Sequence, residues 1–462
     1  MDATINLSSA MPAVAARARR RIMRRILPYL FFIYIIAFLD RVNVGYAALE
    51  MSKDLGFSAE VYGFGAGIFF IGYFLLEIPG TLIVEHWSAR KWIARIMITW
   101  GLLAAGMGFI KTPMQFYVVR FFLGAAEAGF FPGIIVYLSH WFRYADRAKA
   151  VAFFMAAIPI SNILGSPISG LLLGINWLGL RGWSWLFILE GVPAVIFGVV
   201  TIFYLTDRPK QARWLPDDER DWITAELENE QKVKLQSNPL RVFAAFRHRE
   251  VLLLALGYFL VITSAYGLTF WLPTLVKKAS GYSNLGVGLI TAIPWCLALL
   301  CMVLNGWSSD RTEERRWHTA VPIIFGAIGL LLSAVLAQRP AIAIAMLCVA
   351  CAGLNSYLPV FWTLPTRFLT GSAAAASIGL INSVGNLGGF FGPYITGYIN
   401  TATGSFYGGM IYLCCSAVAG SLVILMLREG HKQVEERLTP TNSQSSPAVP
   451  ARELQLRGGP HP

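Results

Sequence analysis

The stretch Phe38-Leu39-Asp40-Arg41-Val42-Asn43-Val44-Gly45 interrupts an otherwise apolar run, 26–48, with two charged side chains and an amide. A helix needs about 20 apolar residues to cross the hydrocarbon core of a bilayer, and this run is long enough. A charged side chain at the centre of such a span costs about 2.5–3.5 kcal/mol even on insertion scales. Asp40 and Arg41 are therefore predicted to have a function inside the membrane.

A second run, 115–138, has the same character because it carries Arg120 and Glu127. The two residues are seven positions apart, which places them on one face of a helix, two turns or ~10.5 Å from each other. That separation is too long for a direct ion pair and suits two groups that line one cavity. Two acids and two bases in one half of a membrane protein predict a transporter of a charged solute.

The composition is that of a membrane protein. Of the 462 residues, 56% are hydrophobic and 14% are charged, whereas soluble domains contain about 25% charged residues. Apolar runs of spanning length recur along nearly the whole chain. The sequence predicts an all-α membrane protein with twelve transmembrane helices, at 26–48, 62–84, 93–111, 115–138, 149–174, 185–206, 251–275, 286–306, 319–337, 341–364, 374–401 and 406–428.

The spans fall into two groups of six, because a polar segment separates the sixth from the seventh. We expect two pseudo-symmetric six-helix bundles, 26–206 and 251–428, joined by a connector, 207–250. A basic tail, 1–25, precedes them, and a polar tail, 429–462, follows and is expected to be disordered.

The distribution of basic residues predicts the orientation. By the positive-inside rule, the arginines before the first span place the N-terminus in the cytoplasm, and about 30 Lys and Arg residues then lie inside and about 6 outside. The net charge of +12 is explained by this topology and by contact with anionic lipid headgroups, and it gives no support to nucleic-acid binding. These arginines are Arg17, Arg19, Arg20, Arg21, Arg24 and Arg25.

The connector is predicted to contain a solvated amphipathic helix, 216–234, with Asp and Glu in its first turn. Both termini and the connector are expected in the cytoplasm. We expect a multi-pass membrane protein that works as a monomer; its placement in a bacterial inner membrane is implied only by the family resemblance described below.

Enzymatic chemistry has little support in the sequence. The pair Cys348 and Cys351 has metal or redox spacing, but it lies in an apolar run with no histidine nearby, and core packing explains it better. The sequence contains no phosphate-binding glycine loop with a lysine and no histidine–cysteine set with metal spacing. We expect no enzyme activity, no metal and no cofactor.

Two loops at equivalent positions of the halves resemble each other: Gly80–Lys91 and Gly306–Arg316. Both resemble the loop motif of the major facilitator superfamily, Gly-x-x-x-Asp-Arg-x-Gly-Arg-Lys/Arg, although Glu314 replaces the second glycine and the first copy differs by one residue of spacing and by Glu for Asp. The resemblance implies a cytoplasmic gate; the alternative is ordinary positive charge in inner loops. The gating candidates are Glu85, Arg90, Lys91, Asp310, Arg311 and Arg315.

The four buried charges allow two interpretations. Adjacent Asp40 and Arg41 lie about 100° apart around a helix and cannot pair with each other, whereas Asn43 shares the face of Asp40. In the functional interpretation the arginines hold a carboxylate bidentately and the acids carry protons. In the structural interpretation, two buried ion pairs, Asp40 with Arg120 and Arg41 with Glu127, only hold the helices together. Buried ion pairs are poor stabilisers, which counts against this interpretation.

Three longer blocks resemble a narrower family, the anion:cation symporters: Phe38–Ala47, Arg120–Gly133 and Asn382–Tyr394. The resemblance implies proton-driven uptake of organic anions such as tartrate, aldonates, hexuronates and aromatic carboxylates. Relatives commonly have Tyr where Phe38 stands, so one hydroxyl for a sugar acid is missing. The run Gly63–Phe74 looks most like the bacterial tartrate subgroup.

The same resemblance assigns roles to individual residues. Asp40 and Glu127 would couple protons, and Arg41 and Arg120 would bind the anion. The other substrate candidates are polar or aromatic side chains on further spans. They are Asn386, Tyr73 and Asn43, together with Trp362, which stands between two prolines where a helix can open toward a central cavity.

The sequence therefore predicts proton-coupled symport of a small organic anion by alternating access. The partners are the anion, protons and membrane lipid. The alternative is an exporter or exchanger of the same superfamily with an aromatic carboxylate or drug-like substrate.

The topology can be tested with a single cysteine. Asn229→Cys lies in the predicted connector helix, so an impermeant thiol reagent should leave it unmodified in intact cells and should modify it in inverted vesicles. Labelling in intact, right-side-out cells would reverse the assigned orientation.

Overall fold

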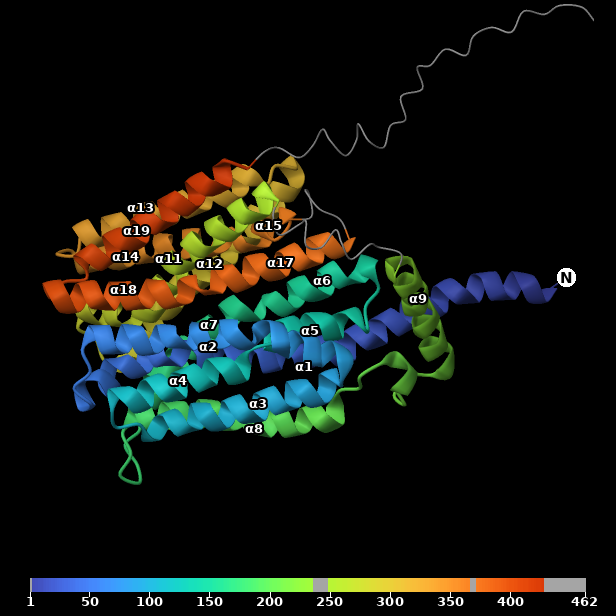
Figure 1. Cartoon of the computed structure of the whole chain (residues 1–462), viewed down its shortest axis with the longest axis horizontal. Helices are drawn as coiled ribbons and strands as arrows, with labels where there is room; N and C mark the ends of the chain where they lie inside the picture. The colour runs from blue at the N-terminus through green and yellow to red at the C-terminus, as the bar shows by residue number, and fades with distance from the viewer. Residues whose placement is uncertain (1, 236–247, 366–370, 428–462) are drawn as a thin grey trace, which may run out of the picture. The chain divides into compact units, whose positions relative to one another are not determined.

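The computed structural model describes residues 2–235, 248–365 and 371–427, which belong to one compact unit. In these ranges the chain is almost entirely helical (Figure 1). The predicted tail 429–462 lies outside the described residues. Eleven of the described helices are long and apolar enough to cross a membrane.

The first half of the chain forms one group of helices (Figure 1). A short helix of the connector, α9 (Asp217–Leu235), follows this half, close to the predicted 216–234. The helices of the first half are α1 (Asp2–Asp54), α2 (Ala59–His86), α3 (Ala89–Gly106), α4 (Pro113–Glu127), α5 (Phe130–Ser139), α6 (Tyr144–Met155), α7 (Ala157–Leu172) and α8 (Gly182–Tyr204).

The second half forms the other group of helices. They are α11 (Arg249–Ser280), α12 (Asn284–Thr312), α13 (Arg316–Val335), α14 (Pro340–Ser356), α15 (Leu358–Phe361), α17 (Gly371–Asn386), α18 (Gly388–Thr403) and α19 (Tyr407–Leu425).

Four of the twelve predicted spans consist of two helices in sequence. The fourth is α4 and α5, the fifth α6 and α7, the tenth α14 and α15, and the eleventh α17 and α18. The eleventh is divided at Leu387 into two helices of 16 residues each and is not among the eleven candidates, whereas the other three divided spans are. The twelve-helix architecture is therefore confirmed, with breaks that hydropathy alone does not show.

The first helix differs from the prediction at its start. The expected tail 1–25 is not separate, because α1 runs without interruption from Asp2 through the arginine-rich segment into the first span. Arginine and alanine, which are frequent in this segment, are good helix formers, so the segment before the span can continue the helix.

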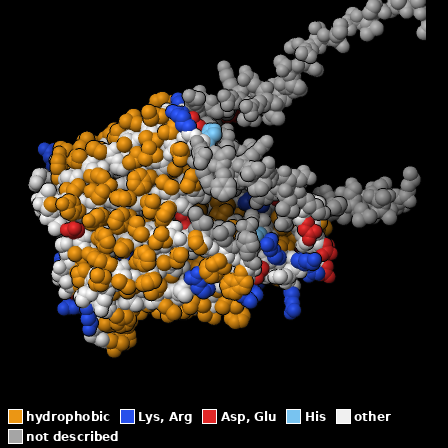
Figure 2. Space-filling model, in the orientation of Figure 1, with side chains coloured by type: hydrophobic (Ala, Val, Ile, Leu, Met, Phe, Trp, Pro, Cys, Tyr) orange, Lys and Arg blue, Asp and Glu red, His pale blue; other side chains and the backbone are white. Residues whose placement is uncertain are grey.

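Apolar side chains cover the visible face of the helices, and charged side chains gather at its two ends (Figure 2). Large apolar residues are exposed on several helices, for example Leu102 at 60%, Phe203 at 81% and Val303 at 63%. A soluble monomer rarely exposes so continuous an apolar surface. This belt is the surface expected to face lipid.

The two halves pack closely at the end far from α9, where α2 meets α18 and α7 meets α12. A Cβ on Gly63 would lie 2.4 Å from the Pro393 carbonyl oxygen, and one on Gly288 would lie 2.4 Å from that of Ser166. Asn284 also donates to the Glu50 carboxylate at 3.0 Å. Only glycine permits such close contact between helix backbones.

The closure at this end can be tested at Gly63. A methyl group there must separate α2 from α18, and overpacking costs about 1–3 kcal/mol, which is roughly a tenfold shift between two conformations. In a cysteine-free background, Gly63→Ala should therefore speed labelling of Thr269→Cys, a cavity residue, from the side far from α9. Gly106→Ala is the control, because a Cβ there meets nothing within 4 Å. Equal labelling rates in the two variants would contradict the close packing.

Candidate transport site

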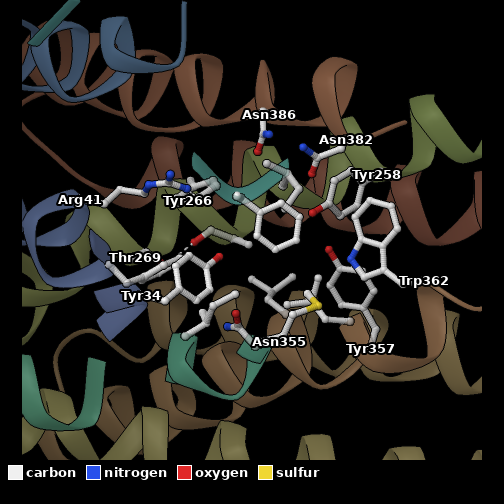
Figure 3. Close-up of a pocket in the computed structure, with 18 of the residues that line it drawn as sticks. Tyr34, Arg41, Tyr258, Tyr266, Thr269, Asn355, Tyr357, Trp362, Asn382 and Asn386 are labelled. Atoms are coloured by element: carbon white, nitrogen blue, oxygen red, sulfur yellow. Dashed lines mark hydrogen bonds between the residues drawn. The ribbon is translucent and has the colours of Figure 1, made fainter. Parts of the chain in front are cut away.

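A cavity of about 90 Å³ lies between the two halves (Figure 3). Its walls are mainly aromatic and amide side chains. Arg41 is the one charged side chain among the described residues that line it. Figure 3 shows Arg41 on one side and Trp362 on the opposite side, with Asn382 and Asn386 on a third side. The cavity therefore offers a cation and several hydrogen-bonding groups in an otherwise apolar enclosure.

Arg41 is fixed by contacts from three other helices. It is 8% exposed, and its guanidinium forms a buried ion pair with Glu127 of α4. A second nitrogen donates to the Tyr266 hydroxyl of α11 at 3.3 Å. The guanidinium carbon lies 5.3 Å from the ring centre of Tyr73 and 5.4 Å from that of Phe69. These aromatic faces favour a cation and hold Arg41 at the cavity wall.

Glu127 reaches Arg41 because the fourth span breaks directly after it. α4 ends at Glu127, and Gly129 starts the next helix with a φ of 83°. That left-handed conformation is easily adopted by glycine alone. Glu127 is 2% exposed and is not among the residues that line the cavity, so it contacts Arg41 from behind the wall.

Asp40 points away from the cavity, as its 100° offset from Arg41 requires. It is 2% exposed, and one carboxylate oxygen accepts a hydrogen bond from Nε1 of Trp100 at 2.6 Å. The other oxygen has no hydrogen-bond partner among the described residues. The structure thus separates the two neighbours: Arg41 faces the cavity, and Asp40 faces α3.

Arg120 also lies outside the cavity lining. It is fully buried, and its guanidinium donates to the backbone oxygens of Gly65 at 3.3 Å and Ala66 at 3.2 Å. It therefore ties α4 to α2. Of the two ion pairs weighed in the sequence, Arg41 with Glu127 is present, whereas Arg120 and Asp40 have the other partners described above. A role for Arg120 in anion binding stays a prediction.

Asn43 faces a residue that the sequence analysis missed, Glu190 of α8. Asn43 is 1% and Glu190 is 7% exposed, and Glu190 also accepts from the Ser169 hydroxyl at 3.1 Å. Glu190 could have been predicted from the sequence, because it is an acid within an apolar run. Asp40 and Glu127 were selected by the same criterion. Asn43 does not line the cavity.

The second half contributes most of the polar side chains that line the cavity. Asn386 and Trp362, both predicted, line the cavity, as does Tyr73 of the first half. Trp362 follows α15 and packs edge-on against Tyr258, with ring centres 5.1 Å apart. Six further lining residues were not predicted as site residues, although one of them, Asn382, begins a block that the sequence analysis singled out. They are Tyr34, Tyr258, Tyr266, Asn355, Tyr357 and Asn382.

Glu77 connects the halves on the side of the cavity toward α9. Its carboxylate accepts hydrogen bonds from Asn382 at 2.6 Å and from Ser383 at 2.8 Å, both on α17. Because this contact crosses between the bundles, it must break when they separate at this end.

The predicted gating loops form pairs within their own half. Arg315 pairs with Asp310 at 2.6 Å, and Arg311 lies 5.5 Å from the Trp307 ring centre. In the other loop the Arg90 backbone N–H donates to Asp207 at 2.8 Å, and Lys91 is exposed. The side chain of Glu85 lies outside the described part of the chain. The gating roles stay predictions.

Counted from Gly306, the motif's second glycine falls at Glu313, one residue before the expected Glu314, and Glu313 has a left-handed φ of 57°. Glu314 itself has a local structural role. Its carboxylate accepts from the backbone N–H groups of Trp317 at 2.8 Å and His318 at 3.1 Å, at the start of α13. Partial burial raises the pKa of Glu314, but these hydrogen bonds outweigh it and hold the pKa below the usual value. A charged carboxylate at a helix N-terminus is stabilising.

Comparisons with known proteins agree with this architecture. The family model described as the Major Facilitator Superfamily matches residues 30–393. A protein of Agrobacterium vitis named "Putative tartrate transporter" is 48% identical over 412 residues, which are 89% of this chain and 94% of that protein. The "Quinolone resistance transporter" of Acinetobacter baumannii is 38% identical over 423 residues, 91% of this chain and 96% of that protein.

A solved structure shares the fold at low sequence identity. The crystal structure of a D-xylose–proton symporter superposes with a TM-score of 0.69 at 16% identity, over 88% of this chain and 99% of that chain.

Arg41 gives the direct test of the site. Arg41→Gln leaves Glu127 buried without a partner, so we expect a loss of about 3–5 kcal/mol in stability and no thermal shift with the small carboxylate that most stabilises the wild type. Arg41→Gln/Glu127→Gln should recover most of the stability but none of the anion response.

Arg120→Gln is the comparison, because its partners are backbone carbonyls. It should lower the unfolding temperature and keep the anion response. A response that survives in Arg41→Gln but disappears in Arg120→Gln would move the anion site to Arg120.

Proposed function

We propose that this chain, which belongs to the major facilitator superfamily and is therefore a multi-pass membrane transporter, takes up a small organic anion together with protons by alternating access. The relatives and the fold are those of transporters and not of enzymes. The observation that carries the proposal is the position of Arg41, at the cavity wall and paired with a buried acid.

Anion binding follows from the environment of Arg41. A guanidinium presents a planar fork that can hold a carboxylate bidentately. In the structure, one guanidinium nitrogen of Arg41 pairs with Glu127 and another donates a hydrogen bond to the Tyr266 hydroxyl. A substrate carboxylate that enters the cavity must therefore share Arg41 with Glu127 or replace it.

This competition supplies a mechanism for coupling. When Glu127 takes a proton, its attraction for Arg41 falls, and the guanidinium is free to bind the anion's carboxylate. When the anion leaves, the buried guanidinium again needs a negative partner, and Glu127 must release its proton. The proton and the anion then travel together, because each intermediate state keeps the charge of Arg41 compensated.

Asp40 is the proposed second coupling acid. Its carboxylate accepts a hydrogen bond from Trp100 of α3. The side chain therefore points away from the guanidinium of Arg41 and does not line the cavity. A change in its protonation would instead act through the packing of α1 on α3. We therefore assign to Glu127 the proton linked directly to the anion.

The substrate class is proposed from the cavity and from the relatives. Hydroxyls of Tyr34, Tyr258 and Tyr266 and amides of Asn382 and Asn386 suit an anion that also carries hydroxyl groups. The relative at 48% identity is named for tartrate transport. A tartrate-like hydroxy acid or aldonate is the first candidate.

A second candidate function is export or exchange of an aromatic carboxylate or drug-like compound. It is supported by the aromatic share of the cavity wall, with Phe38, Phe131 and Trp295 beside the tyrosines. The relative at 38% identity is named for quinolone resistance. Two transport assays distinguish these functions. Uptake of a labelled hydroxy acid supports the first, and efflux of a fluorescent aromatic compound supports the second.

The proposed location is the bacterial inner membrane, with α9 on the cytoplasmic side. Since the halves pack closely at the end far from α9, the structure then corresponds to a conformation closed to the outside.

Neutral variants test the coupling. Asp40→Asn and Glu127→Gln keep the shape of the cavity and the arginines, so we expect loss of pH-driven accumulation with retention of binding or anion exchange. Proteoliposomes with an imposed pH gradient measure accumulation, and preloaded vesicles measure exchange. If both variants still concentrate the anion in response to the gradient, the proton-coupling assignment is wrong.

A further inference from the structure

Five arginines of α1 lie on one face of the helix before the membrane span. Their spacing, i, i+3, i+4, i+7 and i+8, is that of a single helical face. Like charges at such spacings repel each other and weaken a helix. The arrangement therefore needs nearby anions. The five are Arg17, Arg20, Arg21, Arg24 and Arg25.

These side chains line a hollow with a volume of about 540 Å³, which is completed by Tyr204 and Trp214. Tyr204 is the last residue of α8, and its hydroxyl donates to the Arg25 carbonyl at 3.1 Å. The Arg25 guanidinium carbon lies 4.7 Å from the Tyr204 ring centre and 4.9 Å from that of Trp214. One wall of the hollow is therefore rigid and aromatic, and it holds a guanidinium in place.

The protein's own acids neutralise only part of the cluster. Asp218 of α9 pairs with Arg17 at 2.8 Å, and Glu219 pairs with Arg21 at 3.0 Å. Arg20 and Arg24 are exposed and have no carboxylate partner among the described residues. Two of the five arginines thus have acidic partners on α9, one is held by aromatic rings, and two face the hollow with their charges uncompensated.

We propose that this hollow, which we call the arginine hollow, binds a phosphate-bearing anion. Guanidinium groups recognise phosphate oxygens with the same two-pronged geometry that they offer to carboxylates. Two lining residues mark where the hollow lies along the helices. Arg25 comes one residue before the apolar part of α1, and Tyr204 is the last residue of α8. Helices leave the hydrocarbon core at such positions, which is where phospholipid headgroups lie. The first source of the anion is therefore an anionic phospholipid headgroup, and the second is free phosphate.

Binding of an anion in the arginine hollow would affect the neighbouring helix α9. Because Arg17 and Arg21 hold α9 through Asp218 and Glu219, an anion that engages these arginines competes with the connector helix. Occupancy of the arginine hollow would then loosen α9 from α1. This links the connector between the two halves to the composition of the membrane.

The test uses the full-length protein in nanodiscs of phosphatidylcholine, with and without phosphatidylglycerol, and in detergent with inorganic phosphate. Native mass spectrometry counts retained lipid, and intrinsic fluorescence follows thermal unfolding. Arg20→Gln/Arg24→Gln removes the two uncompensated charges and leaves the α9 pairs intact, so we expect phosphatidylglycerol affinity to fall about thirtyfold. The matched control is Arg208→Gln/Lys210→Gln, two exposed basic residues outside the hollow, with the same change in net charge.

The outcomes separate the sources of the anion. Retention and stabilisation by phosphatidylglycerol alone support a lipid headgroup, and an equal effect of inorganic phosphate supports free phosphate. Asp218→Asn should bind more tightly, because Arg17 then keeps only its longer ion pair, with Glu219 at 3.7 Å. The proposal is overturned if neither anion stabilises the wild type, if the control loses as much affinity as the double variant, or if Asp218→Asn binds no better than the wild type.

Discussion

The buried ion pair of Arg41 and Glu127 is the interaction on which the rest of the site depends. A guanidinium in the hydrocarbon layer needs groups that compensate its charge, and for Arg41 the carboxylate of Glu127 does so in this structure. The pair contributes little to stability compared with an apolar contact of the same size. In the proposed mechanism the pair is exchangeable, because an entering carboxylate takes the place of the glutamate once that residue is neutral. In that mechanism, the substrate carboxylate compensates the charge of Arg41 whenever a proton neutralises Glu127.

Breaks in helices and close helix contacts place this pair at the cavity. The fourth span breaks at Gly129, just after Glu127, and Gly124 brings α4 so near to α2 that a Cβ there would lie 1.9 Å from the Phe69 carbonyl oxygen. The same approach exposes the Gly65 and Ala66 carbonyls to Arg120. The glycines between α2 and α18 close the far end, and Glu77 spans the halves on the near side. The cavity therefore lies between a close backbone contact and a polar contact that can separate.

Much of the fold was predictable from the sequence, because the period and length of apolar runs reflect the thickness of a membrane. The different directions of Asp40 and Arg41, about 100° apart, also follow from helix geometry alone. The partners of these residues do not, since they depend on which helices meet. Arg120 was expected at the cavity, yet it contacts backbone carbonyls that become available only where α2 and α4 touch. Glu190 could have been found by the rule that selected Asp40. Tyr258 and Asn355 could not, because aromatic and amide residues are common in membrane helices, and only the fold brings these to the cavity.

The central claim is that the anion displaces Glu127 from Arg41 and that Glu127 takes up a proton when this happens. Proton uptake on anion binding measures this directly, in weakly buffered detergent solution with a pH indicator and the best-binding small carboxylate. The account predicts about one proton taken up per anion bound by the wild type, and none by Glu127→Gln at the same occupancy. Anion binding by the wild type without proton uptake, or equal uptake by Glu127→Gln, would contradict it.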